Sequence, residues 1–166
     1  ECVTSGIIIS KNDNQSIVTV GDNVFFIPDE NSEQNTGAIL KIEERRNHFS
    51  RKEIRYPKED VIASNIDILI IFMSSKSPRL NKHLIDRFLI TAELNRIEPI
   101  ICINKIDLVN EEEFSEELIT YRNMGLKTFL LSAMYNTGID VFLNTIKNRT
   151  SVLTGPSGTG KSTLLN

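Results

Sequence analysis

The sequence of 166 residues lacks the features that mark several large classes of protein. Its only two cysteines, Cys2 and Cys102, are far apart and in no metal-binding spacing, so we expect reduced intracellular thiols rather than a disulfide framework. No apolar run approaches the roughly 18 residues that span a membrane. Acidic residues (22) outnumber Lys and Arg (19), which argues against nucleic-acid binding by the whole surface. These absences favour a cytoplasmic globular protein that makes no use of a membrane.

The strongest pattern that is present covers residues 155–162, which fit G-x-x-x-x-G-K-[ST], the phosphate-binding loop. The glycines let the backbone turn sharply, so that its N–H groups can face phosphate oxygens. Lys161 offers a positive charge to the β- and γ-phosphates, and Ser162 offers a hydroxyl to Mg²⁺. The alternative is a turn that binds nothing. The predicted phosphate-side contacts are Gly155, Pro156, Ser157, Gly158, Thr159, Gly160, Lys161, Ser162 and Thr163.

A second pattern, Asn-Lys-x-Asp, covers residues 104–107 at the end of a predicted buried strand. Asp107 can accept hydrogen bonds from guanine N1–H and the exocyclic amine, which adenine does not offer. Lys105 can lay its methylene stem on the base, and Asn104 can tie this loop to the phosphate loop. A polar turn with an Asp cap is the alternative. Together with a Ser-Ala pair that in GTPases presents an N–H to guanine O6, the predicted base contacts are Asn104, Lys105, Ile106, Asp107, Ser132 and Ala133.

The hydrophobic pattern divides the chain into two predicted domains, residues 1–62 and 63–166. The first reads as short strands with polar turns and favours a small all-β barrel. Its predicted strands cover residues 3–9, 16–20, 24–27 and 37–42. The second alternates strands with helices, which predicts an α/β domain with a mostly parallel sheet and ligand groups at the carboxyl ends of its strands. Its predicted strands cover residues 66–73, 99–103, 128–131 and 150–153.

Three helices are predicted between these strands, around residues 84–92, 114–121 and 137–146, the last with a capping box at its start. The guanine pattern therefore precedes the phosphate loop, whereas an ordinary GTPase has the phosphate loop first. We expect the last strand to insert beside residues 66–73, so that all the loops meet at one sheet edge. The order is that of a circularly permuted domain.

After Ile42, toward the end of the first predicted domain, the sequence becomes basic. This segment has two possible interpretations. It could be a charged face in contact with solvent, or an arm that contacts RNA phosphates. Its cations are Arg45, Arg46, Arg51, Lys52, Arg55 and Lys58.

With these residues in view, the chain resembles the RsgA (YjeQ) family of circularly permuted GTPases that act on the small ribosomal subunit in bacteria. The blocks that carry the resemblance are residues 63–67, 85–89, 104–108 and 155–166. Residues 21–24, the strand with Gly37 and Ile39, and the basic segment resemble that family's N-terminal OB barrel and its exit. The resemblance implies hydrolysis of GTP to GDP and phosphate in late maturation of the small subunit, with magnesium bound with GTP and ribosomal RNA bound by the barrel.

Parts of the family pattern have no counterpart in this sequence. The barrel's first strand, the Asp-x-x-Gly switch that senses the γ-phosphate, and the C-terminal zinc-binding domain are all missing. We expect a piece of a longer, monomeric protein, truncated after the phosphate loop, with zinc only in the absent domain. No general base or water-positioning residue is evident.

Two other interpretations stay open. The phosphate loop would also suit an ATPase or a nucleotide kinase, and the Asn-Lys-x-Asp pattern is the feature that speaks against them. The chain could also belong to an RNA-binding module whose nucleotide site regulates docking without turnover.

Overall fold

The computed structural model describes residues 2–4, 18–29, 37–52, 59–110 and 118–166. The chain divides into two compact units, Glu1–Ile66 and Asp67–Asn166, and each is described here by itself. The boundary predicted after residue 62 falls inside a strand of the first unit, β5 (Glu59–Ser64).

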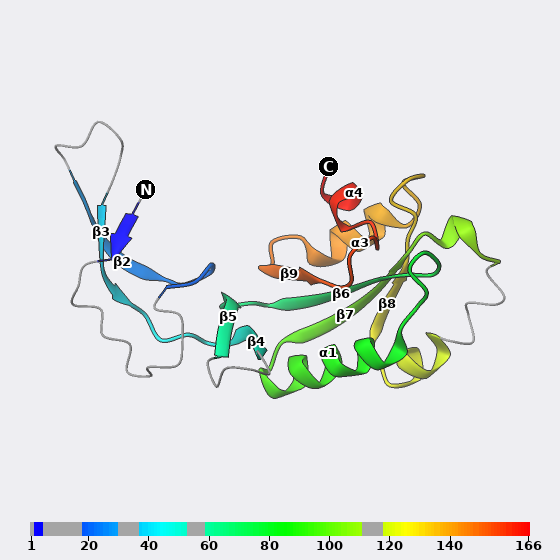
Figure 1. Ribbon diagram of the computed structural model, residues 1–166, viewed down its shortest axis with the longest axis horizontal. Coiled ribbons are helices and arrows are strands. Elements are labelled where there is room, and N and C mark those ends of the chain that lie inside the picture. The colour runs from blue at the N-terminus through cyan, green and yellow to red at the C-terminus, as the bar shows by residue number, and fades with distance from the viewer. Residues whose placement is uncertain (1, 5–17, 30–36, 53–58, 111–117) are drawn as a thin grey trace. The chain divides into compact units, whose positions relative to one another are not determined.

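The described residues of the first unit form two small sheets (Figure 1). In one, β3 (Gly37–Ile42) lies between β1 (Cys2–Thr4) and β2 (Val24–Pro28), parallel to the former and antiparallel to the latter. In the other, β4 (His48–Lys52) pairs antiparallel with β5. The strands predicted at 24–27 and 37–42 are therefore present, whereas most of the one predicted at 3–9 lies outside the described residues.

The strand predicted over residues 16–20 is not formed in its described part. Val20 makes only an isolated bridge with Ala63. The chain turns here because the Thr19 N–H donates to Asp22 Oδ2 at 2.8 Å, and the Asp22 N–H donates to the Thr19 carbonyl at 3.2 Å. Gly21 completes the turn with φ +92°, and a Cβ at that residue would lie 2.2 Å from the Ser64 carbonyl oxygen.

Asp22 is the centre of this turn and binds Arg45, the first cation of the basic segment. The Arg45 guanidinium donates to both carboxylate oxygens, at 2.7 and 2.8 Å, and the Ser64 hydroxyl donates at 2.7 Å. The Asp22 side chain is 1% exposed and that of Arg45 is 15% exposed. Arg45 is therefore a structural residue, and the hypothesis of an RNA-contacting arm cannot use its charge.

In residues 67–110 and 118–166, the described part of the second unit, four parallel strands form one sheet in the order β8-β7-β6-β9, as the sequence predicts for an inserted last strand. All seven residues of β6 (Ile68–Ser74) are buried. The other strands are β7 (Glu98–Asn104), β8 (Lys127–Leu130) and β9 (Ser151–Thr154). The sheet is the predicted parallel α/β core in permuted order.

Helices cover both faces of this sheet (Figure 1). Helix α1 (Lys82–Leu94) packs on β6 and β7, and α3 (Ile139–Ile146) covers the opposite face, where Phe142 is buried against Ile70 and Phe72. Burial on both faces explains why β6 and β7 are apolar almost throughout. Residues 118–123 are helical as well, and α4 (Lys161–Leu165) follows the last strand. None of the described helices is long and apolar enough to cross a bilayer.

Replacing Asp22 by Asn should destabilise the first unit by about 3 kcal/mol at neutral pH, because the Arg45 charge loses its partner in a largely buried site. Burial alone raises the pKa of Asp22, but hydrogen bonds from Arg45, Ser64 and a backbone N–H more than offset this and hold the pKa below its ordinary value of 3.8. The stabilisation is thus present above that value and is lost as pH falls through the lower folded-state pKa.

Denaturant unfolding, monitored by hydrogen exchange of amides in the first unit from neutral pH down to pH 3, measures both the loss of stability and its pH dependence. Glu44→Gln, which removes the same charge from an exposed carboxylate, serves as the control and should change little. Equal stability of Asp22→Asn and the control at neutral pH would contradict the structural role of the ion pair.

Candidate functional site

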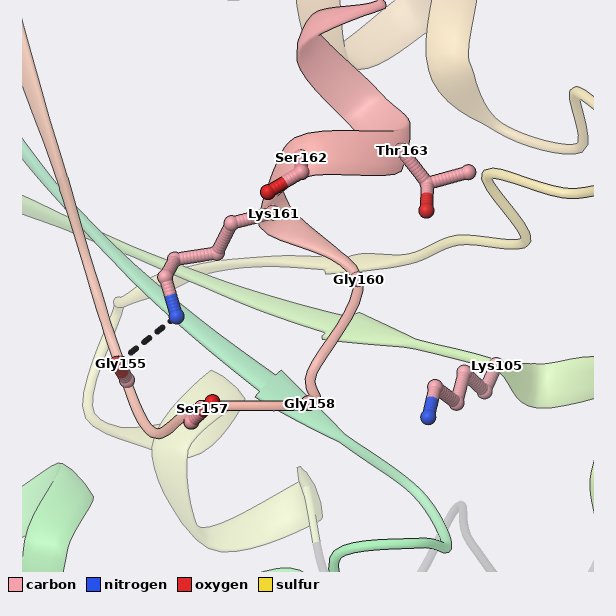
Figure 2. Close-up of a pocket in the computed structure, with 8 residues that line it drawn as sticks. All are labelled: Lys105, Gly155, Ser157, Gly158, Gly160, Lys161, Ser162 and Thr163. Atoms are coloured by element: carbon pink, nitrogen blue, oxygen red, sulfur yellow. Dashed lines mark hydrogen bonds between the residues drawn. The ribbon is translucent and has the colours of Figure 1, made fainter.

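The loop between β9 and α4 follows the outline of the phosphate-binding pattern (Figure 2). Its three glycines have positive φ: Gly155 +148°, Gly158 +79° and Gly160 +95°. A Cβ on Gly155 would lie 2.0 Å from the carbonyl oxygen of Phe72, so the loop can leave the sheet this close to β6 only with glycine there. The glycine spacing in the sequence thus corresponds to real backbone requirements.

The Lys161 side chain curls back along this loop (Figure 2). Its ammonium donates to the carbonyl oxygens of Gly155, at 2.9 Å, and of Pro156. The buried Thr159 turns its hydroxyl to the same Pro156 carbonyl at 3.1 Å. Lys161 therefore holds a positive charge inside the curve of the loop, while the Thr159 hydroxyl is used within the loop.

A cavity of about 650 Å³ opens over this loop. Lys105, from the loop after β7, contributes a second cation to its wall opposite the phosphate-binding loop (Figure 2). The Lys161 ammonium and the hydroxyls of Ser157, Ser162 and Thr163 suit a polyanion. The lining residues are Lys105, Gly155, Ser157, Gly158, Gly160, Lys161, Ser162 and Thr163.

Asn104, the last residue of β7, ties three loops together, and we call this arrangement the Asn104 clamp. Its side-chain amide donates to the Thr159 carbonyl at 2.9 Å, and its side-chain oxygen accepts the Ala133 N–H at 2.9 Å. Asn104 is 2% exposed. A Cβ on Gly160 would lie 2.4 Å from the Asn104 Nδ2, so the second fixed glycine also makes room for the clamp.

Asp107 lies just beyond the clamp, in the short 3₁₀ turn η1 (Ile106–Leu108). It is exposed, and its Oδ1 accepts the Ser132 hydroxyl at 2.6 Å. The Ile106 N–H donates to the Leu131 carbonyl at 3.2 Å, which fixes the turn against the end of β8. Hydrogen bonds thus join Ile106 to Leu131, Asp107 to Ser132 and Ala133 to Asn104, and the Asn104 side chain in turn bonds to the phosphate-binding loop. Ile106, Asp107, Ser132 and Ala133 are not among the residues that line the cavity.

The N–H of Ala133 has a partner within the protein. The sequence pattern seen in GTPases predicts that a backbone N–H of the Ser-Ala pair bonds guanine O6, but that of Ala133 donates to Asn104. Ala133 is therefore part of the clamp.

The predicted capping box at Thr137 is also not formed. The N–H groups of Ser132 and Thr137 each donate to the other's carbonyl, at 3.1 and 3.0 Å, and this bridge occupies the Thr137 backbone. Gly138 becomes the N-cap of α3 in the left-handed conformation, with no side-chain cap. A Cβ there would lie 2.5 Å from the Leu130 carbonyl oxygen, so the closed 132–137 turn needs glycine.

Sequence reasoning missed the polar loop that follows β6. The Ser75 hydroxyl donates to the Lys105 carbonyl at 2.6 Å, the Ser74 hydroxyl donates to the Pro78 carbonyl at 2.7 Å, and the Lys105 ammonium donates to the Ser77 carbonyl. Ser74 and Ser75 are both buried. Their position at the carboxyl end of a buried parallel strand, where ligand groups gather, was the available signal.

Comparison with known proteins links the chain to one family. A family model described as RsgA GTPase matches residues 42–166. The chain is 39% identical to the small ribosomal subunit biogenesis GTPase RsgA of Chlorobaculum parvum, over 99% of the chain and 55% of the relative. It is also 39% identical to the protein of the same name from Flavobacterium psychrophilum, over 90% and 47%.

Two solved structures are similar over 99% of the chain. They are the crystal structure of YjeQ from Thermotoga maritima, with a TM-score of 0.76 and 30% identity, and that of YloQ, a circularly permuted GTPase, with 0.70 and 31%. The chain covers 55% and 53% of those two chains. It spans about half the length of the relatives it matches.

Replacing Asn104 by Ala should remove both hydrogen bonds of the clamp and leave two main-chain groups unpaired, at a cost of roughly 2–4 kcal/mol of stability. Hydrogen exchange at the Ala133 amide should accelerate, since that amide loses its acceptor. Asn95→Ala, which removes one contact to the Thr91 carbonyl at the end of α1, is the control and should leave the Ala133 amide unchanged. Unaltered exchange at Ala133 in the Asn104 variant would contradict the clamp.

Proposed function

The chain belongs to the RsgA GTPase family, and on this basis we propose that it supplies the nucleotide site of a GTPase. The protein would hydrolyse GTP to GDP and phosphate and act in biogenesis of the small ribosomal subunit. Relatives named for this role match nearly the whole chain, and the chain covers 55% and 47% of their own length.

The observation that carries the proposal is the Asn104 clamp. The Asn-Lys-x-Asp segment and the phosphate-binding loop lie 55 residues apart in sequence, yet one buried side chain joins them. A guanine base and its phosphates can therefore be bound together by elements that are held in fixed register. A glycine-rich turn that binds no nucleotide would not require a connection to the Asn-Lys-x-Asp segment.

For the base, we propose that Asp107 accepts the guanine N1–H and amine. The Ser132 hydroxyl fixes one of its carboxylate oxygens, and the exposure of Asp107 leaves it open to a ligand. Lys105 would pack its methylene stem against the base. Ile106 and Ala133 would support these residues through their backbone contacts rather than touch the base with side chains.

For the phosphates, we propose that Lys161 and backbone N–H groups of the loop between Gly155 and Thr163, Pro156 excepted, bind the β- and γ-groups. The Lys161 charge already faces the inside of the loop, where it can supply positioning and charge neutralisation, the main terms in phosphoryl transfer. Lys161 is the residue to which we assign stabilisation of the transferred phosphate. We assign no general base.

Magnesium fits the site as a partner of the nucleotide rather than as an ion held by protein groups alone. Among the described residues no three His, Cys, Asp or Glu side chains lie close enough together to hold a metal ion. Ser162 offers one exposed hydroxyl beside the cavity, and a hydroxyl oxygen is a suitable ligand for Mg²⁺. Bound with GTP, the ion would neutralise charge on the phosphate oxygens.

For the first unit, we propose that residues 1–62 form an OB-like barrel that binds ribosomal RNA. Arg45 is excluded from that contact by its bonds to Asp22. We further propose that the complete protein is monomeric and cytoplasmic, and that zinc belongs only to a region outside this sequence.

Turnover by the full-length protein tests the proposal. GTP hydrolysis should rise when purified small ribosomal subunits are added, and ATP should not be hydrolysed. Lys161→Ala should weaken GTP binding roughly tenfold or more, because a charge-assisted contact on the phosphates is lost, and should abolish the stimulated rate. Lys147→Ala, at an exposed lysine after α3, is the matched control.

The rival functions predict different results. ATP bound or hydrolysed as well as GTP would support an ATPase or nucleotide kinase. GTP bound but never hydrolysed, with or without subunits, would support a nucleotide-regulated RNA-binding module. Unchanged GTP affinity in the Lys161 variant would show that the loop does not engage phosphate.

The Asp107→Asn variant should prefer xanthosine triphosphate to GTP. The amide NH₂ would face the guanine amine, so one hydrogen bond is lost and two donors oppose each other, at a cost of a few kcal/mol. Xanthine carries a carbonyl where guanine has the amine, and that carbonyl can accept from the NH₂. The amide oxygen can still accept from Ser132.

Competitive binding of xanthosine triphosphate, GTP and ATP to wild-type and variant protein measures this change. Asp140→Asn, an exposed aspartate of α3, is the charge-matched control. A variant that still prefers GTP would mean that Asp107 does not read the base.

A further inference from the structure

We propose that Ser75 is a positioning residue for guanine recognition, which acts by holding Lys105 and the η1 turn that carries Asp107. The inference rests on the proposed GTP site and adds a residue outside both sequence patterns. Ser75 directly follows β6, and 6% of it is exposed. Its N–H donates to the Asn104 carbonyl at 2.9 Å, which fixes it beside the clamp residue.

The Ser75 hydroxyl donates to the Lys105 carbonyl at 2.6 Å. The same carbonyl accepts the Leu108 N–H at 3.1 Å, so Ser75 bonds to the group that starts the η1 turn. Two residues further along the same loop, the Ser77 carbonyl accepts the Lys105 ammonium. Lys105 is thus held at its main chain and at the tip of its side chain by one loop.

Lys105 needs this support because its backbone is in the left-handed region, with φ 63° and ψ 36°. That conformation is unfavourable for a residue with a Cβ and persists when neighbouring contacts impose it. If Lys105 relaxed, its stem would leave the wall of the cavity (Figure 2), and η1 would change the direction in which it presents Asp107. The phosphate-binding loop would keep its own glycines and its contact with Asn104.

The physical consequence is a selective loss. Removing the Ser75 hydroxyl should weaken contacts to the base while contacts to the phosphates persist. A residue that served only the stability of the fold would affect both halves of the site equally or neither.

The test measures the affinities of GDP, ADP and inorganic pyrophosphate for the full-length protein, as wild type and as Ser75→Ala. GDP affinity should fall roughly fivefold, the effect of one hydrogen bond, and the preference for GDP over ADP should fall with it. Pyrophosphate affinity should not change. Ser75→Cys, which fills the same space with a much weaker donor, should show the same direction of change.

Thr145→Ala is the control, because it removes a hydroxyl that also donates to a main-chain carbonyl, that of Val141, but lies within α3. It should keep the GDP-to-ADP preference. The inference would be overturned by wild-type GDP affinity in Ser75→Ala, or by an equal loss of GDP and pyrophosphate affinity in that variant. Wild-type behaviour of Ser75→Cys, or an equal effect of Thr145→Ala, would overturn it as well. A wild-type protein with no preference for GDP over ADP would instead refute the proposed function.

Discussion

The second unit depends on one buried side chain, that of Asn104. Its amide and its oxygen bond to main-chain groups of two different loops, at sequence separations of 55 and 29 residues. Leaving a buried polar group without a hydrogen-bond partner is costly. The Asn104 side chain has both of its partners only when the two loops lie against the end of β7. Gly160 follows from the same constraint, because a Cβ there would occupy the place of the Asn104 amide. The arrangement of the candidate site is thus set by hydrogen-bond satisfaction in the core.

The permuted order of the chain has little effect on this geometry. Parallel strands place their carboxyl ends on one sheet edge whatever the order in which the chain visits them. The last strand, β9, pairs with β6 in the register Ile68↔Ser151, and its loop then turns toward the residues that follow β7. The first unit relies on a comparable long-range connection, since Arg45 and Ser64 meet Asp22 across 23 and 42 residues.

Most of the fold of the second unit could be predicted from the sequence. The strand predicted at 66–73 is β6 with a shift of one or two residues, and the predicted helix and strand at 84–92 and 99–103 lie within α1 and β7. Errors occurred where a specific hydrogen bond, rather than hydrophobic periodicity, decides local structure. Residues 18–20 form a turn because the Thr19 N–H bonds to Asp22. The N-cap of α3 is Gly138 rather than the predicted Thr137, because Ser132 pairs with the Thr137 backbone.

The sequence by itself determined which chemical groups the site contains, because each pattern is local: the glycines, Lys161 and Ser162 stand within eight residues, and Asn104 and Asp107 within four. It also determined the alternation of strands and helices, which follows from hydrophobic periodicity. Only the tertiary structure decided which of these groups remain free for a ligand. Arg45 and the N–H of Ala133 are used within the protein, and Ser75 enters the site through Lys105. The reason is physical: a hydrogen-bond partner from another strand or loop leaves no periodic or local trace in the sequence.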